Sequence, residues 1–143
     1  MKAVKLKPIV FRGVLMKDYF IEYINSEVRI WRIWTKKRIM QRISIPKNGK
    51  AAYPKMKFRL NGETISADIH RVIGENLVPF PIPKGITSKV WKATSDSIKD
   101  LIKSLYFVNH IDHDKYNCDP RNLEWVTPKG NVRAYLNHIA KLK

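Results

Sequence analysis

Residues 105–133 have the sequence LYFVNHIDHDKYNCDPRNLEWVTPKGNVR, and this stretch decides the fold of the C-terminal part of the chain. The apolar run from Leu105 to Val108 predicts a strand, and a polar loop follows from Ile111 to Arg121. A second strand is predicted over Leu123 to Thr127. Thr127-Pro128 then provides a helix N-cap followed by proline at the first helical position. The predicted order is therefore strand, long loop, strand, helix.

Three polar side chains of this stretch are suited to the hydrolysis of a phosphodiester. His110 ends the first strand, and histidine is a good general base because its ordinary pKa lies near neutrality. The reaction also needs charge stabilisation on the leaving oxygen, which a Mg²⁺-like ion supplies. Such an ion prefers oxygen ligands, and Asn109 and Asn131 each offer a side-chain carbonyl. Spacing alone does not distinguish this site from a buried histidine beside ordinary asparagines.

Three segments of the stretch resemble the HNH module of phage and intron homing endonucleases. They are Val108-Asn-His-Ile-Asp112, Pro120-Arg-Asn-Leu-Glu-Trp-Val-Thr-Pro128 and Gly130-Asn-Val-Arg133. The resemblance implies a ββα-metal fold and a metal-dependent DNA endonuclease with Mg²⁺ or Mn²⁺ as its cofactor. The family's general base falls on His110, and its metal ligands fall on Asn109 and Asn131. The central asparagine of the motif, which ties the loop together and orients the base, falls on Asn122.

The resemblance extends upstream more weakly and shows two departures. Tyr23-Ile-Asn-Ser-Glu-Val-Arg29 and Ile69-His-Arg-Val72 are similar to the small sheet domain and helix that precede HNH in many of these enzymes. Many relatives have aspartate where this chain has Asn109, so we expect weak metal binding before DNA phosphate completes the site. The segment from Val78 to Ser104 is longer than usual and is either a binding insert or a spacer.

The first half of the chain has the patterns of β-structure. Strands are predicted over Tyr19 to Ile24 and Val28 to Trp34, separated by a turn at Asn25-Ser26. Residues Lys36 to Ile45 alternate in character, and Pro46 to Gly49 break that pattern.

The clearest strand is Lys55 to Leu60, in which apolar and basic side chains alternate. Asn61-Gly62 then suits a tight hairpin with a returning strand over Glu63 to Ala67. The basic face of this hairpin is either a solubilising surface or a surface for DNA phosphates, and the charge of the chain favours the second. The residues predicted to bind DNA are Arg29, Arg32, Lys55, Lys57, Arg59 and Arg133.

A helix is predicted after the hairpin. Asp68 is a plausible N-cap, and Ile69, Val72, Ile73 and Leu77 recur at helical spacing. Pro79, Pro81 and Pro83 end this helix, and Ser95 could cap a further helix through Ile98, Leu101 and Ile102.

Charge and cysteine content restrict the class of the protein. The 143 residues include 28 Lys and Arg against 12 Asp and Glu, a net charge of +16, so nucleic acid is the expected partner. No apolar run is long enough to span a membrane, and the N-terminus lacks a signal peptide, so we expect no membrane partner. The single cysteine, Cys118, fits a cytoplasmic setting and excludes a cysteine-rich zinc site.

Other polar and aromatic residues receive simpler interpretations. Asp112, His113 and Asp114 are expected to form a solvated loop, with an auxiliary role less favoured. His70 is expected to pack at a domain junction, and Cys118 to have no chemical role. The four tryptophans are core candidates: Trp31, Trp34, Trp91 and Trp125.

The sequence thus predicts an α+β fold, with an N-terminal antiparallel sheet and packed helix followed by a C-terminal ββα-metal module. The expected division is a DNA-binding sheet region over residues 1–80, a connector or insert over 81–104, and the nuclease module over 105–143. The expected function is cleavage of double-stranded DNA by a monomer. An inactive DNA-binding protein on the same scaffold is the alternative, and an RNA-binding structural protein is a third reading that charge alone suggests.

Overall fold

A computed structural model describes residues 1–45 and 53–142. The predicted break at Pro46 to Gly49 lies outside the described residues. The fold is α+β, as predicted, with an N-terminal antiparallel sheet and a C-terminal helix. In chain order the elements are β1 Val4–Phe11, β2 Val14–Ile24, β3 Glu27–Trp34, β4 Lys37–Met40, β5 Lys55–Leu60, β6 Glu63–Asp68, α1 Ile69–Leu77, α2 Ser88–Ala93, α3 Asp96–Ser104, β7 Phe107–His110, the 3₁₀ turn η1 Pro120–Asn122, β8 Leu123–Val126 and α4 Pro128–Lys141.

Strands β1 to β4 form an antiparallel meander in the order β1-β2-β3-β4. The predicted turn at Asn25-Ser26 is confirmed, with φ of 54° and 59°, as a tight primed turn requires. Strand β1 was not predicted, because its lysines and Pro8 obscure the alternation, and an edge strand tolerates proline. The predicted strand over Lys36 to Ile45 is shorter in the structure, since β4 ends at Met40 and only Ser44 makes a further bridge, to Lys55.

The β5–β6 hairpin has the predicted register and turn. Asn61 and Gly62 adopt φ of 51° and 80°, and Leu60 pairs with Glu63. Met56 and Phe58 are buried, whereas the basic residues between them are exposed. Phe58 meets the ring of Tyr19 edge-on at 4.9 Å, and the Tyr19 hydroxyl accepts a hydrogen bond from the Arg59 amide. These contacts join the hairpin to the first sheet around one core.

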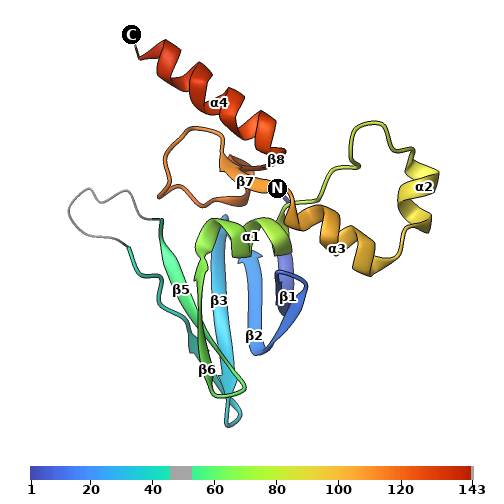
Figure 1. Cartoon of the computed structure of the whole chain (residues 1–143). Helices are drawn as coiled ribbons and strands as arrows, with labels where there is room; N and C mark the ends of the chain where they lie inside the picture. Colours follow the sequence, from blue (N-terminus) through green and yellow to red (C-terminus); the bar gives the residue numbers. More distant parts are fainter. Residues whose placement is uncertain (46–52, 143) are drawn as a thin grey trace.

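Helix α1 links that core to the C-terminal elements. It lies across one end of the strands, with β7, β8 and α4 on its other side (Figure 1). The buried face predicted from helical spacing is confirmed: Ile69, Val72, Ile73 and Leu77 belong to the core. Val108 of β7 and Leu123 of β8 belong to the same cluster. A Cβ at Gly74 would lie 2.6 Å from a methyl carbon of Val108, so α1 and β7 approach too closely for any larger residue.

The predicted helix ends are confirmed in position, and the capping bonds differ between them. Thr127 caps α4, its hydroxyl accepting from the Gly130 amide at 3.0 Å. Asp68 occupies the N-cap of α1 without a capping bond, because its carboxylate accepts from the Lys55 ammonium instead. Ser95 precedes α3, also without a capping bond.

Two expectations about the fold are wrong in detail. The first strand of the C-terminal unit begins at Phe107 and not at Leu105, which ends the preceding helix and is 62% exposed. None of the four tryptophans is fully buried, and Trp34 is 52% exposed. No helix in the described ranges has both the length and the apolar character needed to cross a membrane.

Candidate active site

His110 ends strand β7, where it pairs with Leu123 of β8 and is only 6% exposed. Its ring lines a hollow of about 370 Å³, which we call the His110 hollow. Asn109 and Asn131 line the same hollow, together with Tyr53, His113, Lys115, Tyr135 and His138. A second hollow of about 370 Å³ shares Tyr53, Asn109, His110 and Asn131 and extends to Asp68 and His70. The structure therefore brings the predicted base and both predicted metal ligands to one place.

Asn109 is oriented by its cross-strand neighbour. It pairs with Glu124 in the β7–β8 register, and its Nδ2 donates to Glu124 Oε1 at 3.0 Å. Because the amide nitrogen is held by the carboxylate, the carbonyl Oδ1 remains as the oxygen available to an ion. Glu124 also brings a negative charge next to a ligand that has none of its own.

Asn131 lies in the first turn of α4, and the helix start fixes its backbone. Its amide donates to the Thr127 carbonyl at 2.8 Å, and Pro128 presets the helical φ at the first position. The short β8 strand and this cap bring the first turn of α4 beside the end of β7. The remainder of α4 extends away from the body of the protein (Figure 1).

Asn122 ties together the loop that follows His110. Its Nδ2 donates to Asp112 Oδ1 at 2.9 Å and to the Asn117 carbonyl at 2.9 Å, and its Oδ1 accepts from the Asp112 amide at 3.1 Å. Its backbone carbonyl accepts from the Ile111 amide, directly after the end of β7. Hydrogen bonds from Asn117, the Asp114 amide and Asn122 lower the pKa of Asp112. Asp112 is thus an ionised member of the hydrogen-bond network around Asn122.

The ring of His110 is flanked by two other rings. Tyr53 lies nearly parallel to it, with centroids 5.9 Å apart, and His70 of α1 lies 4.9 Å away. Burial lowers the pKa of His110, while the charges of Asp112 and Asp114 act in the opposite direction. Burial, and then the neighbouring His110, lower the pKa of His70 to about 4. His70 is therefore a neutral side chain at neutral pH.

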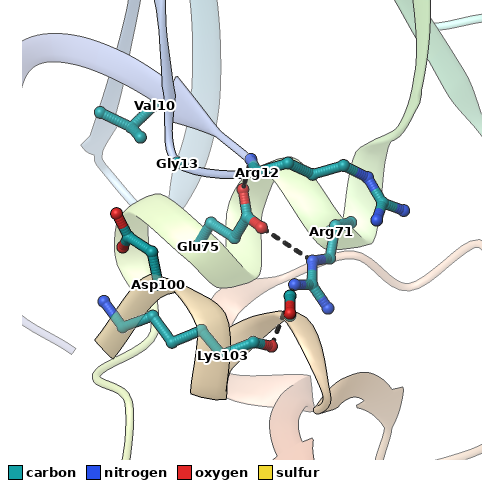
Figure 2. A pocket seen from close by; sticks show the side chains of 8 residues that line it. Val10, Arg12, Gly13, Arg71, Glu75, Asp100 and Lys103 are labelled. Atoms are coloured by element: carbon teal, nitrogen blue, oxygen red, sulfur yellow. Dashed lines mark hydrogen bonds and ion pairs between the residues drawn. The ribbon is translucent and has the colours of Figure 1, made fainter. Parts of the chain in front are cut away.

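Arg71 anchors the segment that leads into β7. Its Nε donates to Glu75 at 2.8 Å, and its terminal nitrogens donate to the Tyr106 and Lys103 carbonyls at 2.6 and 3.3 Å. Figure 2 shows Arg71 with its partners Glu75 and Lys103 at a small cavity of about 90 Å³, where the end of α3 meets α1 and the turn at Arg12. Arg71 thereby holds the end of α3, and the strand start after it, against the helix that packs behind His110.

The six residues predicted to bind DNA are not all brought together, although two of them line one hollow. Arg32 and Arg59 line a wide hollow of about 600 Å³ with Lys17 and the exposed Trp34. This hollow lies by the β5–β6 turn, at the end of the sheet away from β7, β8 and α4 (Figure 1). Lys57 is exposed in the middle of β5.

Three further predicted DNA-binding residues have other surroundings. Lys55 forms an ion pair with Asp68, and Arg29 forms one with Glu27. Arg133 lines a separate hollow on the outer side of α4 and does not join Asn131. Their positions neither group them into one surface nor exclude contact with an extended polyanion.

The donor atoms around the His110 hollow determine which kind of metal ion it could hold. In residues 1–45 and 53–142 no three or more His, Cys, Asp or Glu side chains are grouped to hold a metal. The oxygen donors among the residues that line the His110 hollow include the carboxamides of Asn109 and Asn131. Such a set suits a hard cation whose remaining ligands come from water and phosphate, and it does not suit a zinc site built from thiolate and imidazole.

Sequence reasoning missed three residues of the site. Tyr53 and His70 are 57 and 40 positions from His110, so no local spacing connects them with it. Glu124 faces Asn109 only through the strand register, which the predicted hairpin could have indicated had the two strands been aligned. His70 was expected to pack at a junction, and its ring does lie between α1 and β7.

Comparison with known proteins gives one family match. Residues 68–133 match a family model described as HNH endonuclease, a range that begins just before α1 and ends in the first half of α4. No curated protein and no solved structure matches the chain.

Proposed function

We propose that the protein cuts double-stranded DNA with one divalent metal ion and His110 as general base, since residues 68–133 match the family model of HNH endonucleases. The observation that carries the proposal is the placement of His110, Asn109 and Asn131 around one hollow, from the end of β7 and the first turn of α4. A base and two hard oxygen donors around one open space are the parts that phosphodiester hydrolysis requires.

In the proposed reaction His110 accepts a proton from the water that attacks the phosphorus. The strand end and the rings of Tyr53 and His70 hold the imidazole in place. Its lowered pKa keeps it in the neutral form that can act as a base at neutral pH. A Mg²⁺ or Mn²⁺ ion held by the carbonyl oxygens of Asn109 and Asn131 would stabilise charge on the leaving oxygen. The products are a 5′-phosphate and a 3′-hydroxyl.

The finer identity proposed is that of a homing endonuclease of the phage and intron type, acting as a monomer. Basic side chains along β3 and β5 would hold the duplex through its phosphates while the hollow engages one strand. The competing candidate is a DNA-binding protein that kept this scaffold and lost activity. The neutral ligand Asn109 favours that alternative, since it weakens the hold on the ion.

Cleavage of supercoiled plasmid in Mg²⁺, Mn²⁺ or EDTA tests the proposal. We expect nicked or linear product with either ion and none with EDTA. Binding of plasmid without any cleavage under all three conditions would favour the inactive DNA-binding protein, and preference for RNA over DNA would favour the third reading.

Two asparagine-to-alanine variants within α4 test the proposed metal site, one as the test and the other as its control. Asn131→Ala removes an oxygen from the His110 hollow, whereas Asn137→Ala removes an asparagine from the outer hollow of the same helix. We expect Asn131→Ala to need a much higher metal concentration for half-maximal cleavage and to be partly restored by Mn²⁺. Asn137→Ala should keep the wild-type metal dependence. An unchanged metal titration for Asn131→Ala would remove it from the site.

A further inference from the structure

Cys118 contacts Nε2, one of the two ring nitrogens of His110. It lies in the loop between β7 and η1, half-buried and packed against the core. Its Sγ is 3.7 Å from His110 Nε2 and donates to the Lys115 carbonyl at 3.6 Å. Both distances are within the range of hydrogen bonds that involve sulfur.

Because the Cys118 thiol has a single hydrogen, its other contact bears on which atom is the donor in the hydrogen bond with His110. Burial raises the pKa of the Cys118 thiol to about 11, so the thiol keeps its hydrogen at neutral pH. A thiol has one hydrogen, and when it is directed at the Lys115 carbonyl, sulfur is the acceptor in the contact with Nε2. Nε2 then carries the hydrogen of the neutral imidazole, and Nδ1 carries the lone pair.

We propose that Cys118 is a positioning residue of the endonuclease site, whose sulfur holds His110 in the tautomer that leaves Nδ1 free to accept the proton of the attacking water. The inference rests on the proposed function, because the tautomer matters for catalysis only if His110 is the base. Cys118 would then have a chemical role, whereas the sequence led us to expect none.

The other neighbours of the imidazole do not select the tautomer in this way. Tyr53 and His70 flank the ring, the first nearly parallel and the second tilted by 51°. Ring contacts of this kind restrain where the imidazole lies, but they are indifferent to which nitrogen bears the hydrogen. Asn122 acts on the loop through Asp112 and Asn117. Within residues 1–45 and 53–142, the hydrogen-bond contact at Nε2 is the one with Cys118.

The test compares Cys118→Ala with Cys118→Ser. Serine keeps one hydrogen and an acceptor, so it can repeat both contacts over a shorter reach, whereas alanine can make neither. A hydrogen bond of ordinary strength shifts a two-state equilibrium by roughly 2- to 10-fold. We therefore expect Cys118→Ala to lower kcat for plasmid nicking by about that factor, with KM for DNA unchanged. Cys118→Ser should recover at least part of the loss.

A spectroscopic readout separates this role from a merely structural one. Nitrogen-15 spectra of the imidazoles, with His110→Ala as the assignment control, report which nitrogen of His110 is protonated. We expect the Nε2–H form in the wild type and in Cys118→Ser, and a mixture with the Nδ1–H form in Cys118→Ala. In a His110→Ala background, Cys118→Ala should cause no further loss of residual cleavage, since it acts through His110.

An unchanged tautomer together with unchanged kcat in folded Cys118→Ala would overturn the proposal. If alanine leaves too little folded protein, Cys118→Val offers a second side chain that can neither donate nor accept. The spectra do not depend on cleavage. If the wild type fails to cut DNA but Cys118→Ala still mixes the tautomers, the nuclease proposal fails while the contact between Cys118 and His110 stands.

Discussion

The loop between β7 and β8 and the basic side chains of β3 and β5 are organised in opposite ways. In the loop, Asn122, Asn117 and Asp112 bond to one another within a span of eleven residues. On the strands, the cations are spread along the sheet, and Lys55 and Arg29 are paired with acidic neighbours. Chemistry at a single bond requires fixed geometry, whereas contact with a polyanion requires charge over a long surface. The two regions should therefore respond to mutation in different ways.

The largest effect is expected at the base. His110→Ala should lower the cleavage rate by about 10²- to 10⁴-fold, because it removes the group that accepts the proton of the attacking water. Affinity for DNA should be nearly unchanged, since the ring acts on water and does not bind phosphate. The measurement pairs plasmid nicking with a binding assay on the folded variant. A normal cleavage rate would contradict the assignment and remove the contrast between the two regions.

The charged strands should show a graded loss instead. Lys57→Gln and Arg59→Gln should each reduce the salt dependence of DNA binding by about 0.9 in the slope of log K against log salt, for target and non-target DNA alike. Lys55→Gln is the internal comparison, because its ammonium is already paired with Asp68 and should contribute less. Slopes that match the wild type for Lys57→Gln and Arg59→Gln would mean that this face of β5 points away from DNA.

These two regions also show what the sequence could and could not reveal. The C-terminal order of strand, loop, strand and helix was predictable because Thr127-Pro128, the apolar runs and the polar loop are local signals. The same holds for the β5–β6 hairpin, whose alternation and Asn61-Gly62 turn agree. Tyr53 and His70 were out of reach, since only the packing of α1 against β7 brings them to His110. Pairing of Lys55 with Asp68 follows from the predicted hairpin register, but Asp68 was expected to cap α1 instead.

A smaller effect is expected at Asn109, where the structure changes the simple expectation. Asn109→Asp introduces a negative charge at the proposed metal site and should tighten metal binding. However, the new carboxylate would replace an amide that now donates to Glu124 at 3.0 Å, so two negative charges would face each other when no ion is present.

We therefore expect Asn109→Asp alone to lower thermal stability without metal and to regain it as Mg²⁺ is added. Glu124→Gln should relieve the repulsion in the double variant, since the two changes are coupled through one contact. Thermal melts and metal titrations of both single variants and the double variant measure this. Additive effects of the two changes would show that Glu124 does not act on residue 109.

The smallest effect is expected in the acid stability of the junction between α1 and β7. Burial and the neighbouring His110 lower the pKa of His70 from 6.5 to about 4. The unfolded chain therefore binds a proton at His70 between these values that the folded chain does not, and stability must rise with pH across this window. This contribution to the stability of the folded state is fully present above about pH 6.5 and is lost as the pH falls toward 4. At pH 5 the loss of stability relative to neutral pH is on the order of 1 kcal/mol after allowance for partial solvent exposure. This loss corresponds to a fall of roughly 3 to 5 °C in Tm.

His70→Phe keeps a ring in contact with Tyr53 and His110 but cannot be protonated. Between pH 7 and pH 5 we expect its Tm to fall less than that of the wild type, with the remaining fall caused in part by His110, whose pKa is also lowered by burial. The melts are followed by circular dichroism in low salt without divalent ions, so that only protonation changes. An equal fall for both proteins would mean that His70 is solvated in the folded state, and that the ring cluster around His110 is looser than the 4.9 Å contact indicates.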